Sequence, residues 1–328
     1  MLAADPARRE PTLSEGNVLH QPVMLDEVLR LLDPPPGAVV IDATLGPGGH
    51  AEALLSRLGP AGRLIGIDRD PSALEHARAR LASFGDRFVP VHGDHREITS
   101  LAASVGVGSV DAVLADLGVS SAQLDDASRG FAFSADGPLD MRMDPASGGP
   151  SAAELIAALD EPELTDLIAT WGEDRNARRI ARAIVRERGH EPIRTTRHLR
   201  EVVEAGAGPT ARRFRIHPAT RTFQALRIAV NREIEGIPEL VSGAVSLLRP
   251  RGRLAVISFH SLEDRAVKTA LHELTHRCVC PPDLPVCGCG RANLVRLVTS
   301  GAVVPSDDEV ASNPRARSAR LRAAERLP

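Results

Sequence analysis

The residues with the clearest chemical potential surround a short glycine-rich turn. Gly46, Gly48 and Gly49 follow a β-branched run, and an apolar helical pattern begins directly after them. Glycines at such a turn leave backbone N–H groups open to a ligand at the start of a helix. Asp68 lies twenty positions after Gly48, at the end of a second apolar run. An acid at this point accepts hydrogen bonds from ribose hydroxyls, so the spacing predicts a site for an adenosine-containing ligand.

Two other interpretations fit the same turn. Gly46-x-Gly48-x-x-Ala51 matches the dinucleotide fingerprint, so a nicotinamide-dependent oxidoreductase is an alternative, and a plain tight turn is another. Asp42, four residues before the first glycine, favours a different ligand. A carboxylate at this strand end attracts a cation and repels a pyrophosphate. S-adenosylmethionine carries an ammonium and a sulfonium group, and it is such a cation.

Two polar clusters follow predicted strands and would face that ligand. The first runs from Asp116 to Gln123, and the second runs from Ser258 to Arg265. Ligands of open α/β sheets bind at the carboxyl ends of strands, which makes both clusters candidate site loops. In the second cluster, Ser261 and Asp264 fit a helix capping box. His260 is then either a catalytic residue or a hydrogen-bonded core histidine, and the sequence leaves both open.

The four cysteines form one short cluster, Cys278-x-Cys280 and Cys287-x-Cys289. Four thiolates can hold zinc tetrahedrally, but C-x-C is tighter than the usual ligand spacing. Four clustered cysteines in a chain of 328 residues do not resemble an extracellular disulfide framework either. We therefore favour free thiols or a redox-sensitive loop and assign no metal ligand, with a structural zinc site on Cys278, Cys280, Cys287 and Cys289 as the alternative.

The elements that position these residues alternate between strand and helix. Strands are predicted at residues 38–44, 63–68, 87–92, 110–117 and 253–259. Asp70 and Pro71 are typical of a helix N-cap and first turn. This alternation predicts an α/β fold with a doubly wound, mostly parallel, Rossmann-like sheet.

The interval between the fourth and fifth strands is much longer than a crossover requires. Residues 222–248 can supply the crossover helix, so we expect residues 125–217 to form an inserted, mainly helical domain. Residues 1–124 and 218–328 would then form the ligand-binding domain. From Arg175 to Arg232 there are fifteen arginines against four acids, a local charge of +11 in a chain of net charge −3. This asymmetry indicates that the insert binds a polyanion such as RNA.

The composition is that of a globular protein with two domains. The chain exceeds the size at which one hydrophobic core usually stops growing, and 43% of its residues are hydrophobic. The polar N-terminal segment lacks a signal-peptide core, and no apolar run could cross a bilayer. These features predict a cytoplasmic protein and carry no signal for an oligomeric state.

Several long motifs resemble one family, the ribosomal RNA small subunit methyltransferase H family. They extend from His20 to Arg326 and comprise residues 20–25, 42–50, 116–123, 129–144, 217–227, 258–265 and 313–318. The resemblance implies a class I methyltransferase that uses S-adenosylmethionine to methylate N4 of a decoding-centre cytosine, cytosine-1402, in 16S rRNA of the 30S subunit. A non-catalytic ribosome-assembly factor that binds the same cofactor is an alternative.

The resemblance also implies the site residues. The cofactor contacts fall on Gly48, Gly49, His50, Asp68, His95, Asp116 and Gln123. The family often has an aromatic residue where this chain has His95, so adenine stacking by an imidazole is expected here. Asp116 is also our candidate to orient the amine that is methylated, and His260 is the second catalytic candidate. Phe131 and Phe133 are candidates for base stacking or for packing between the domains.

Overall fold

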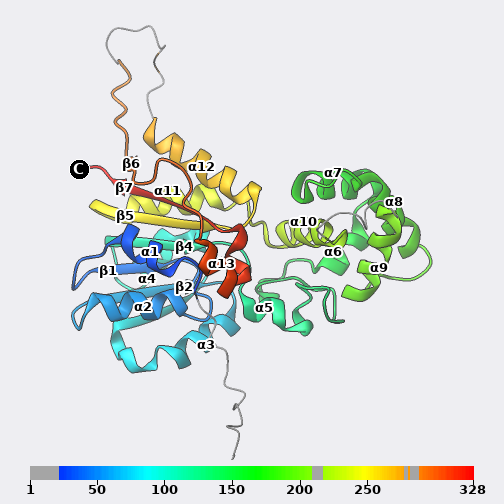
Figure 1. The fold of residues 1–328 in the computed structure, drawn as a ribbon, viewed down its shortest axis with the longest axis horizontal. Helices are drawn as coiled ribbons and strands as arrows, with labels where there is room; N and C mark the ends of the chain where they lie inside the picture. Colours follow the sequence, from blue (N-terminus) through cyan, green and yellow to red (C-terminus); the bar gives the residue numbers. More distant parts are fainter. Residues whose placement is uncertain (1–21, 209–216, 277–279, 281–287) are drawn as a thin grey trace, which may run out of the picture.

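The computed structural model describes residues 22–208, 217–276, 280 and 288–328, and it contains a seven-stranded, mostly parallel sheet. The strand order is β3-β2-β1-β4-β5-β7-β6 (Figure 1). The parallel strands are β1 (Val39–Asp42), β2 (Arg63–Asp68), β3 (Phe88–His92), β4 (Val110–Asp116) and β5 (Leu248–Ser258). At the other edge β7 (Arg320–Arg326) runs antiparallel to both β5 and β6 (Val295–Leu297). The predicted doubly wound fold is confirmed.

Helices cover both faces of this sheet (Figure 1). One face packs against α1 (Leu25–Leu32), α2 (Gly49–Leu58) and α3 (Pro71–Arg80). The other packs against α4 (Ile98–Ser104), α11 (Ile237–Leu247) and α12 (Ser261–Thr275). The strand order reverses between β1 and β4, so their carboxyl ends form the crevice where such folds bind ligands.

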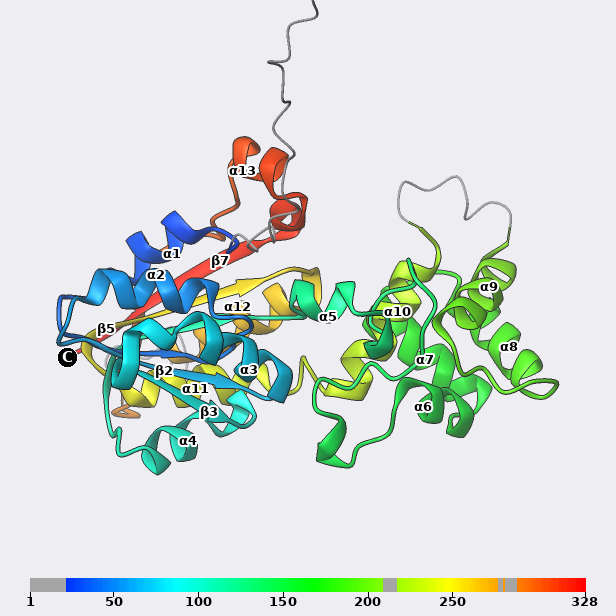
Figure 2. The ribbon, with the colours of Figure 1, turned by 90° about the horizontal axis from the view of Figure 1, so that it is seen from below.

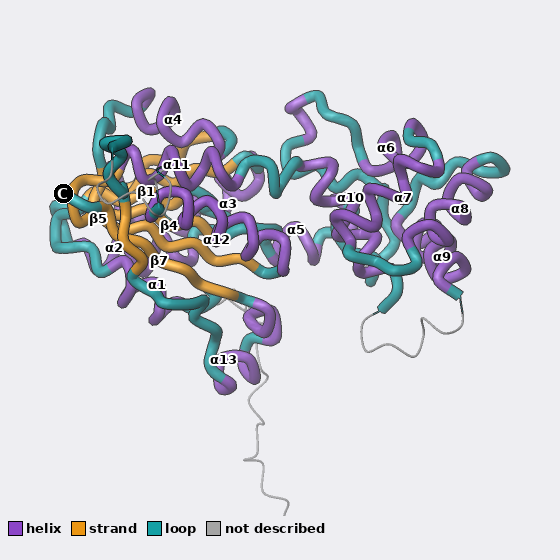
Figure 3. Tube along the Cα trace, turned by 90° about the horizontal axis from the view of Figure 1, so that it is seen from above, coloured by secondary structure: helices purple, strands orange, loops and turns teal. Residues whose placement is uncertain are grey.

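A separate helical unit lies beside the sheet (Figures 2 and 3). It contains α6 (Ala152–Ala158), α7 (Glu161–Gly172), α8 (Ala177–Arg188), α9 (Thr196–Ala207) and α10 (Ala219–Asn231), which share a third hydrophobic core. In α8 the predicted apolar stripe of Ile180, Ala181 and Ile184 is buried in this core. The short helix α5 (Ser121–Asp125) leads from the sheet into the unit.

Helix α10 differs from the sequence expectation. Residues 222–248 form two helices, and only α11 packs against the sheet as a crossover helix. Phe223 and Leu226 of α10 are buried among the helices of the helical unit, and α10 packs on α7. We therefore propose that the helical unit extends beyond residue 217 to Asn231.

The C-terminal segment returns to the sheet domain. Glu309 of α13 (Asp307–Ser312) accepts the Met24 N–H at 2.6 Å, and Arg315 pairs with Asp125 of α5 at 2.8 Å. This segment therefore borders the carboxyl edge of the sheet. Within the described ranges, no helix has the length and apolar character that a bilayer crossing demands.

Candidate cofactor and substrate site

A cavity of about 510 Å³ opens at the carboxyl edge of the sheet. Its walls come from the turns after β1, β2, β3 and β4, the start of α12, the end of α10 and the C-terminal segment. Of the predicted cofactor residues, those that line it are Gly49, His50, Asp68, His95, Asp116 and Gln123. Gly48 lies directly behind the wall as the N-cap of α2.

The glycine-rich turn requires glycine for two separate reasons. Gly48 has φ +83°, a left-handed conformation that residues with a Cβ rarely adopt. A Cβ at Gly49 would lie 2.7 Å from Pro22 Cγ, so this glycine permits close packing of the N-terminal segment. The Gly46 N–H donates to Asp68 Oδ2 at 2.8 Å, which ties the turn to the end of β2.

Two carboxylates near this turn are held in a partly neutral state. Asp42 is 1% exposed, and burial raises its pKa to about 7. Burial also raises the pKa of Asp68 to about 6, although its oxygens accept the N–H groups of Asp70 and Gly46. A carboxyl group whose pKa is close to physiological pH loses its proton readily when a cation binds nearby. The pocket therefore favours a positively charged ligand.

We expect S-adenosylmethionine to bind more tightly as pH rises. The cation stabilises the ionised forms of Asp42 and Asp68, so binding releases protons wherever these acids are protonated in the free protein. Affinity should increase by about tenfold or more between pH 5.5 and 8 and then level off. Titration calorimetry in buffers of different ionisation enthalpy measures both the affinity and the protons released. A flat profile with no proton release would contradict this assignment.

Asp42 and Asp68 also determine how the stability of the folded protein changes with pH. Their pKa values in the folded protein exceed the ordinary value of 3.8, so their contribution to stability is complete below that pH. It is lost as pH rises through about 6 and 7. The increase in Tm on adding S-adenosylmethionine should accordingly be larger at pH 8 than at pH 5.5, as thermal unfolding can measure.

Asp116 ends β4 in the middle of the crevice. Its N–H donates to Thr44 Oγ1, and its Oδ2 lies 3.7 Å from His50 Nδ1. The other oxygen, Oδ1, is buried and has no hydrogen-bond partner among the described residues. Burial raises the pKa of Asp116 well above its ordinary value, with further contributions from the charges of Asp42 and Glu263. An unpaired carboxyl oxygen in this position is suited to accept a hydrogen bond from a bound ligand.

The second polar cluster differs from the sequence expectation. The capping box at the start of α12 is formed by His260 and Glu263, so the prediction of Ser261 with Asp264 is wrong. Ser261 donates to Glu173 Oε2, and Asp264 pairs with Arg322. His260 does not line the cavity, but Glu263 does. We therefore propose a positioning role for His260 in place of a catalytic one.

Glu263 is the residue that sequence reasoning missed. It is 1% exposed, and its Oε2 accepts the Phe259 N–H at 2.7 Å. Burial alone would raise its pKa, but the His260 ring, whose Nε2 lies 3.2 Å from Oε1, and the charge of Arg227 lower it below the ordinary value. Glu263 is therefore a negative charge that acts on Asp116. The spacing of His260 and Glu263 is that of a capping box, which could have identified Glu263. Histidine is an unusual N-cap, so the pattern was not recognised.

A metal ion is a possible occupant of the same cluster, since Glu233, His260 and Glu263 bring ligand atoms within 4.8 Å of one another. The contacts argue against it. Both Glu233 oxygens accept hydrogen bonds from Arg227, a partly buried cation that a metal would have to displace. His260 Nδ1 accepts the Glu263 N–H, which leaves the proton on Nε2, the atom nearest Glu263 Oε1. The cluster is better described as a charge-paired network.

His95 occupies the predicted adenine-binding position after β3. Its Nε2 atom is buried and has no hydrogen-bond partner among the described residues. Burial lowers the pKa of His95 to about 4, with smaller contributions from the charges of Arg69 and Arg96. The ring is therefore neutral at physiological pH. A neutral imidazole can stack on a purine and also offer one ring nitrogen to it.

Gln123 is held by the protein on both ends of its amide. Its Oε1 accepts the Ser120 N–H at 2.9 Å, and its Nε2 donates to Asp70 Oδ2 at 2.7 Å. Asp70 is the N-cap of α3, as predicted, and it also accepts a hydrogen bond from Arg129. Gln123 therefore contributes a fixed wall to the cavity.

The arginines of α8 and the two phenylalanines have different surroundings. Arg178, Arg179 and Arg186 are exposed on the outer face of α8. Phe131 is buried in the core of the helical unit, whereas Phe133 packs on the rings of His217 and Phe223. Both phenylalanines therefore pack within the helical unit.

Of the cysteine cluster, Cys278 and Cys287 lie outside the described residues.

The strand order, the glycine-rich turn and the acids at the ends of β1, β2 and β4 define a Rossmann-like methyltransferase. Residues 17–327 match the model of the MraW methylase family. The chain therefore belongs to the MraW methylase family, whose methyl donor is S-adenosylmethionine.

Relatives named "Ribosomal RNA small subunit methyltransferase H" match nearly the whole chain. The protein of Geobacter sulfurreducens is 53% identical over 94% of this chain and 99% of its own length. That of Thermomicrobium roseum is 50% identical over 94% of both chains. Among solved structures, Aeropyrum pernix fibrillarin with natively bound S-adenosyl-L-methionine is similar at 11% identity and a TM-score of 0.39, over 88% of this chain and 67% of that one.

Proposed function

We propose that this protein transfers a methyl group from S-adenosylmethionine to the N4 amine of a cytosine in small-subunit rRNA, within the 30S particle. The observation that carries the proposal is the acidic cavity at the carboxyl edge of the sheet, which Asp68, Asp116 and Glu263 line. The names of the relatives support the rRNA substrate. The choice of a cytosine and of its N4 follows from the resemblance of the sequence motifs. Family membership leaves the nicotinamide alternative without support.

The residues present fit the methyl donor. Asp68 would accept the ribose hydroxyls, His95 would meet the adenine, and Asp42 would attract the positive charge of the amino-acid end and sulfonium. In the reaction the amine nitrogen bonds to the methyl carbon while the carbon–sulfur bond breaks. Positioning should supply much of the rate, because both reactants must be held in line.

Asp116 has the central role in this proposal. The cytosine amine is a weak nucleophile because its lone pair is delocalised, and it must lose a proton during or after transfer. Asp116 Oδ1 would accept a hydrogen bond from the amine and then take that proton. Burial, with added contributions from the charges of Asp42 and Glu263, keeps the pKa of Asp116 high, which makes its carboxylate a better proton acceptor once the cationic donor has ionised it.

The target base must leave its stack to reach Asp116. The helical unit contributes Thr220, Asn231 and Met143 to the cavity lining, and Phe259 follows β5, so the cavity offers an aromatic ring and polar groups. We place the base there. The exposed arginines of the helical unit would contact phosphates and set the approach of the RNA.

Reversing the charge of Arg178 and Arg179 should weaken RNA binding and leave S-adenosylmethionine binding unchanged. If each contacts one phosphate, the slope of log affinity against log salt should fall by about 0.7 per lost contact. Filter binding across a salt series measures this slope. The matched control is Arg63→Glu with Arg78→Glu, two exposed arginines of the sheet domain. Equal slopes in the two double variants would remove α8 from the RNA-binding surface.

The function itself is tested with unmodified small subunits and labelled S-adenosylmethionine. We expect label in one nucleoside, which digestion and mass spectrometry identify as N4-methylated cytidine. Naked rRNA, tested in parallel, distinguishes the particle from the free RNA as substrate. Binding of both ligands without transfer would instead indicate a non-catalytic assembly factor. Transfer to another base or atom would overturn the proposed specificity and keep the methyltransferase.

A further inference from the structure

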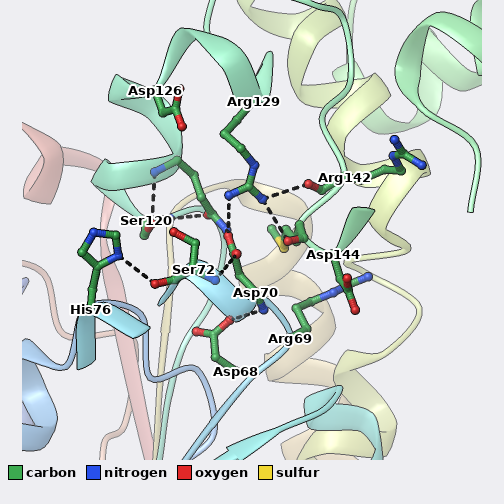
Figure 4. Close-up of polar contacts among 12 residues, drawn as sticks. Asp68, Arg69, Asp70, Ser72, His76, Ser120, Asp126, Arg129, Arg142 and Asp144 are labelled. Carbon is green, nitrogen blue, oxygen red and sulfur yellow. Dashed lines mark hydrogen bonds and ion pairs between the residues drawn. The ribbon is translucent and has the colours of Figure 1, made fainter. Parts of the chain in front are cut away.

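The junction between the sheet domain and the helical unit contains Arg129, whose side chain contacts both (Figure 4). Its Nη1 donates to Asp70 Oδ2 at 2.8 Å. Its Nη2 donates to the carbonyl oxygens of Arg142 at 3.0 Å and Met143 at 2.9 Å. The side chain is only 16% exposed, so these contacts form in a desolvated position where hydrogen bonds to charged groups are strong.

On the sheet side, Arg129 reaches the cofactor site through one residue. Asp70 is 2% exposed, and its N–H donates to Asp68 Oδ1 at 2.8 Å. The same Asp70 oxygen that accepts from Arg129 also accepts from Gln123, a wall of the cavity. Burial is the main reason that the pKa of Asp68 is raised, the negative charge of Asp70 adds to this, and Arg129 offsets the charge of Asp70. Arg129 therefore influences both the position and the charge of the ribose-binding acid.

On the helical side, Arg129 fixes the loop that forms the opposite wall. The Met143 N–H donates to Asn231 Oδ1 at 2.9 Å, and Asn231 Nδ2 donates to the Met141 carbonyl at 2.7 Å. Met143 and Asn231 both line the cavity, on the wall where we place the target base. The Arg129 carbonyl also accepts the Met141 N–H at 3.0 Å. One guanidinium thus joins the two walls that would hold the two reactants.

We propose that Arg129 is a positioning residue that couples cofactor binding to RNA binding. This inference rests on the proposed function. RNA held by the helical unit would keep residues 141–143 in place, and through Arg129 would keep Asp70, Gln123 and Asp68 in their binding geometry. Each ligand therefore lowers the cost of ordering the site for the other, which gives positive coupling. The expected effect is an increase of about five- to twentyfold in the affinity of either ligand when the other is bound.

The chemistry of the guanidinium allows its charge and its bridge to be separated. A lysine at this position keeps a positive charge for Asp70, but it cannot donate in a planar fork to Asp70 and to two carbonyls together. Glutamine removes the charge as well. Arg142→Lys is the matched control, because Arg142 lies in the same loop and its side chain donates hydrogen bonds to Asp140, Pro145 and Gly149 and not to Asp70.

The experiment measures the Kd of S-adenosylhomocysteine, which cannot transfer a methyl group, with and without saturating unmodified small subunits. The wild type and R142K should both show the five- to twentyfold effect. Arg129→Lys should bind S-adenosylhomocysteine alone within about threefold of wild type and lose the coupling. Arg129→Gln should bind it about tenfold more weakly and also lose the coupling.

Three results would overturn the inference. They are an absence of coupling in the wild type, full coupling in Arg129→Lys, or an equal loss in R142K, which would assign the effect to the loop as a whole. If the wild type bound neither S-adenosylhomocysteine nor small subunits, the proposed function would fail together with the inference. Independent binding of both ligands would refute the coupling alone.

Discussion

Asp116→Asn should reduce the single-turnover rate of methyl transfer by about 100- to 1000-fold at saturating S-adenosylmethionine. The amide keeps the size of the side chain and the Thr44 contact of its backbone, but it cannot take a proton from the amine. We expect the affinity for the methyl donor to change by less than about tenfold, because Asp42 and Asp68 still supply negative charge. Rapid-quench measurements with unmodified small subunits give the rate, and calorimetry gives the affinity.

Asp111→Asn is the control for this variant. Asp111 lies in β4 at the opposite end of the strand from Asp116. There it accepts the Val39 N–H at 2.8 Å and pairs with Arg249. This change should alter stability and leave the rate intact. If Asp116→Asn transferred methyl groups at the wild-type rate once the donor was saturating, Asp116 would have no part in the chemistry.

Asp68→Asn should weaken binding of S-adenosylmethionine by about 100-fold or more. Both carboxylate oxygens of Asp68 accept backbone N–H groups, from Gly46 and from Asp70. An amide NH₂ in place of one oxygen would set a donor against a donor and displace the glycine-rich turn or the start of α3. The variant also loses the charge that accepts the ribose hydroxyls, and hydrogen bonds to charged groups contribute about 1.5–3 kcal/mol each.

Calorimetry with S-adenosylmethionine and with S-adenosylhomocysteine measures this loss. Asp111→Asn is again the matched control, because its carboxylate also accepts a backbone N–H beside a parallel strand. The control should keep wild-type affinity for both ligands. Equal affinities in wild type and Asp68→Asn would exclude Asp68 from the cofactor site.

Local patterns made much of the sheet domain predictable. The strand at residues 63–68 was predicted with the bounds that β2 has, and Asp70 with Pro71 correctly marked the start of α3. The start of β5 was missed, because Pro250 and Gly252 are disfavoured inside strands. The structure accommodates them beside a register shift between Val110 and Ala112 of the neighbouring strand.

Contacts between distant segments could not be predicted from the sequence. The pattern of α10 fits a crossover helix equally well, and only the burial of Phe223 and Leu226 against other helices assigns it to the helical unit. The Arg129–Asp70 pair joins residues 59 positions apart, and neither local spacing nor charge identifies such a pair. The glycine-rich turn and Asp68 were recognisable because their chemistry depends on spacing along a single βαβ unit.

The position of β7 has a consequence for how the chain is made. This strand lies inside the sheet between β5 and β6, and its Glu325 pairs with Arg253 and Arg296. During translation the helical unit, formed from a contiguous stretch, can collapse while the sheet still lacks an inner strand. The sheet is therefore completed only after residues 320–326 have been synthesised, and a chain terminated shortly before residue 320 would expose the bare edge of β5 to other unfolded strands.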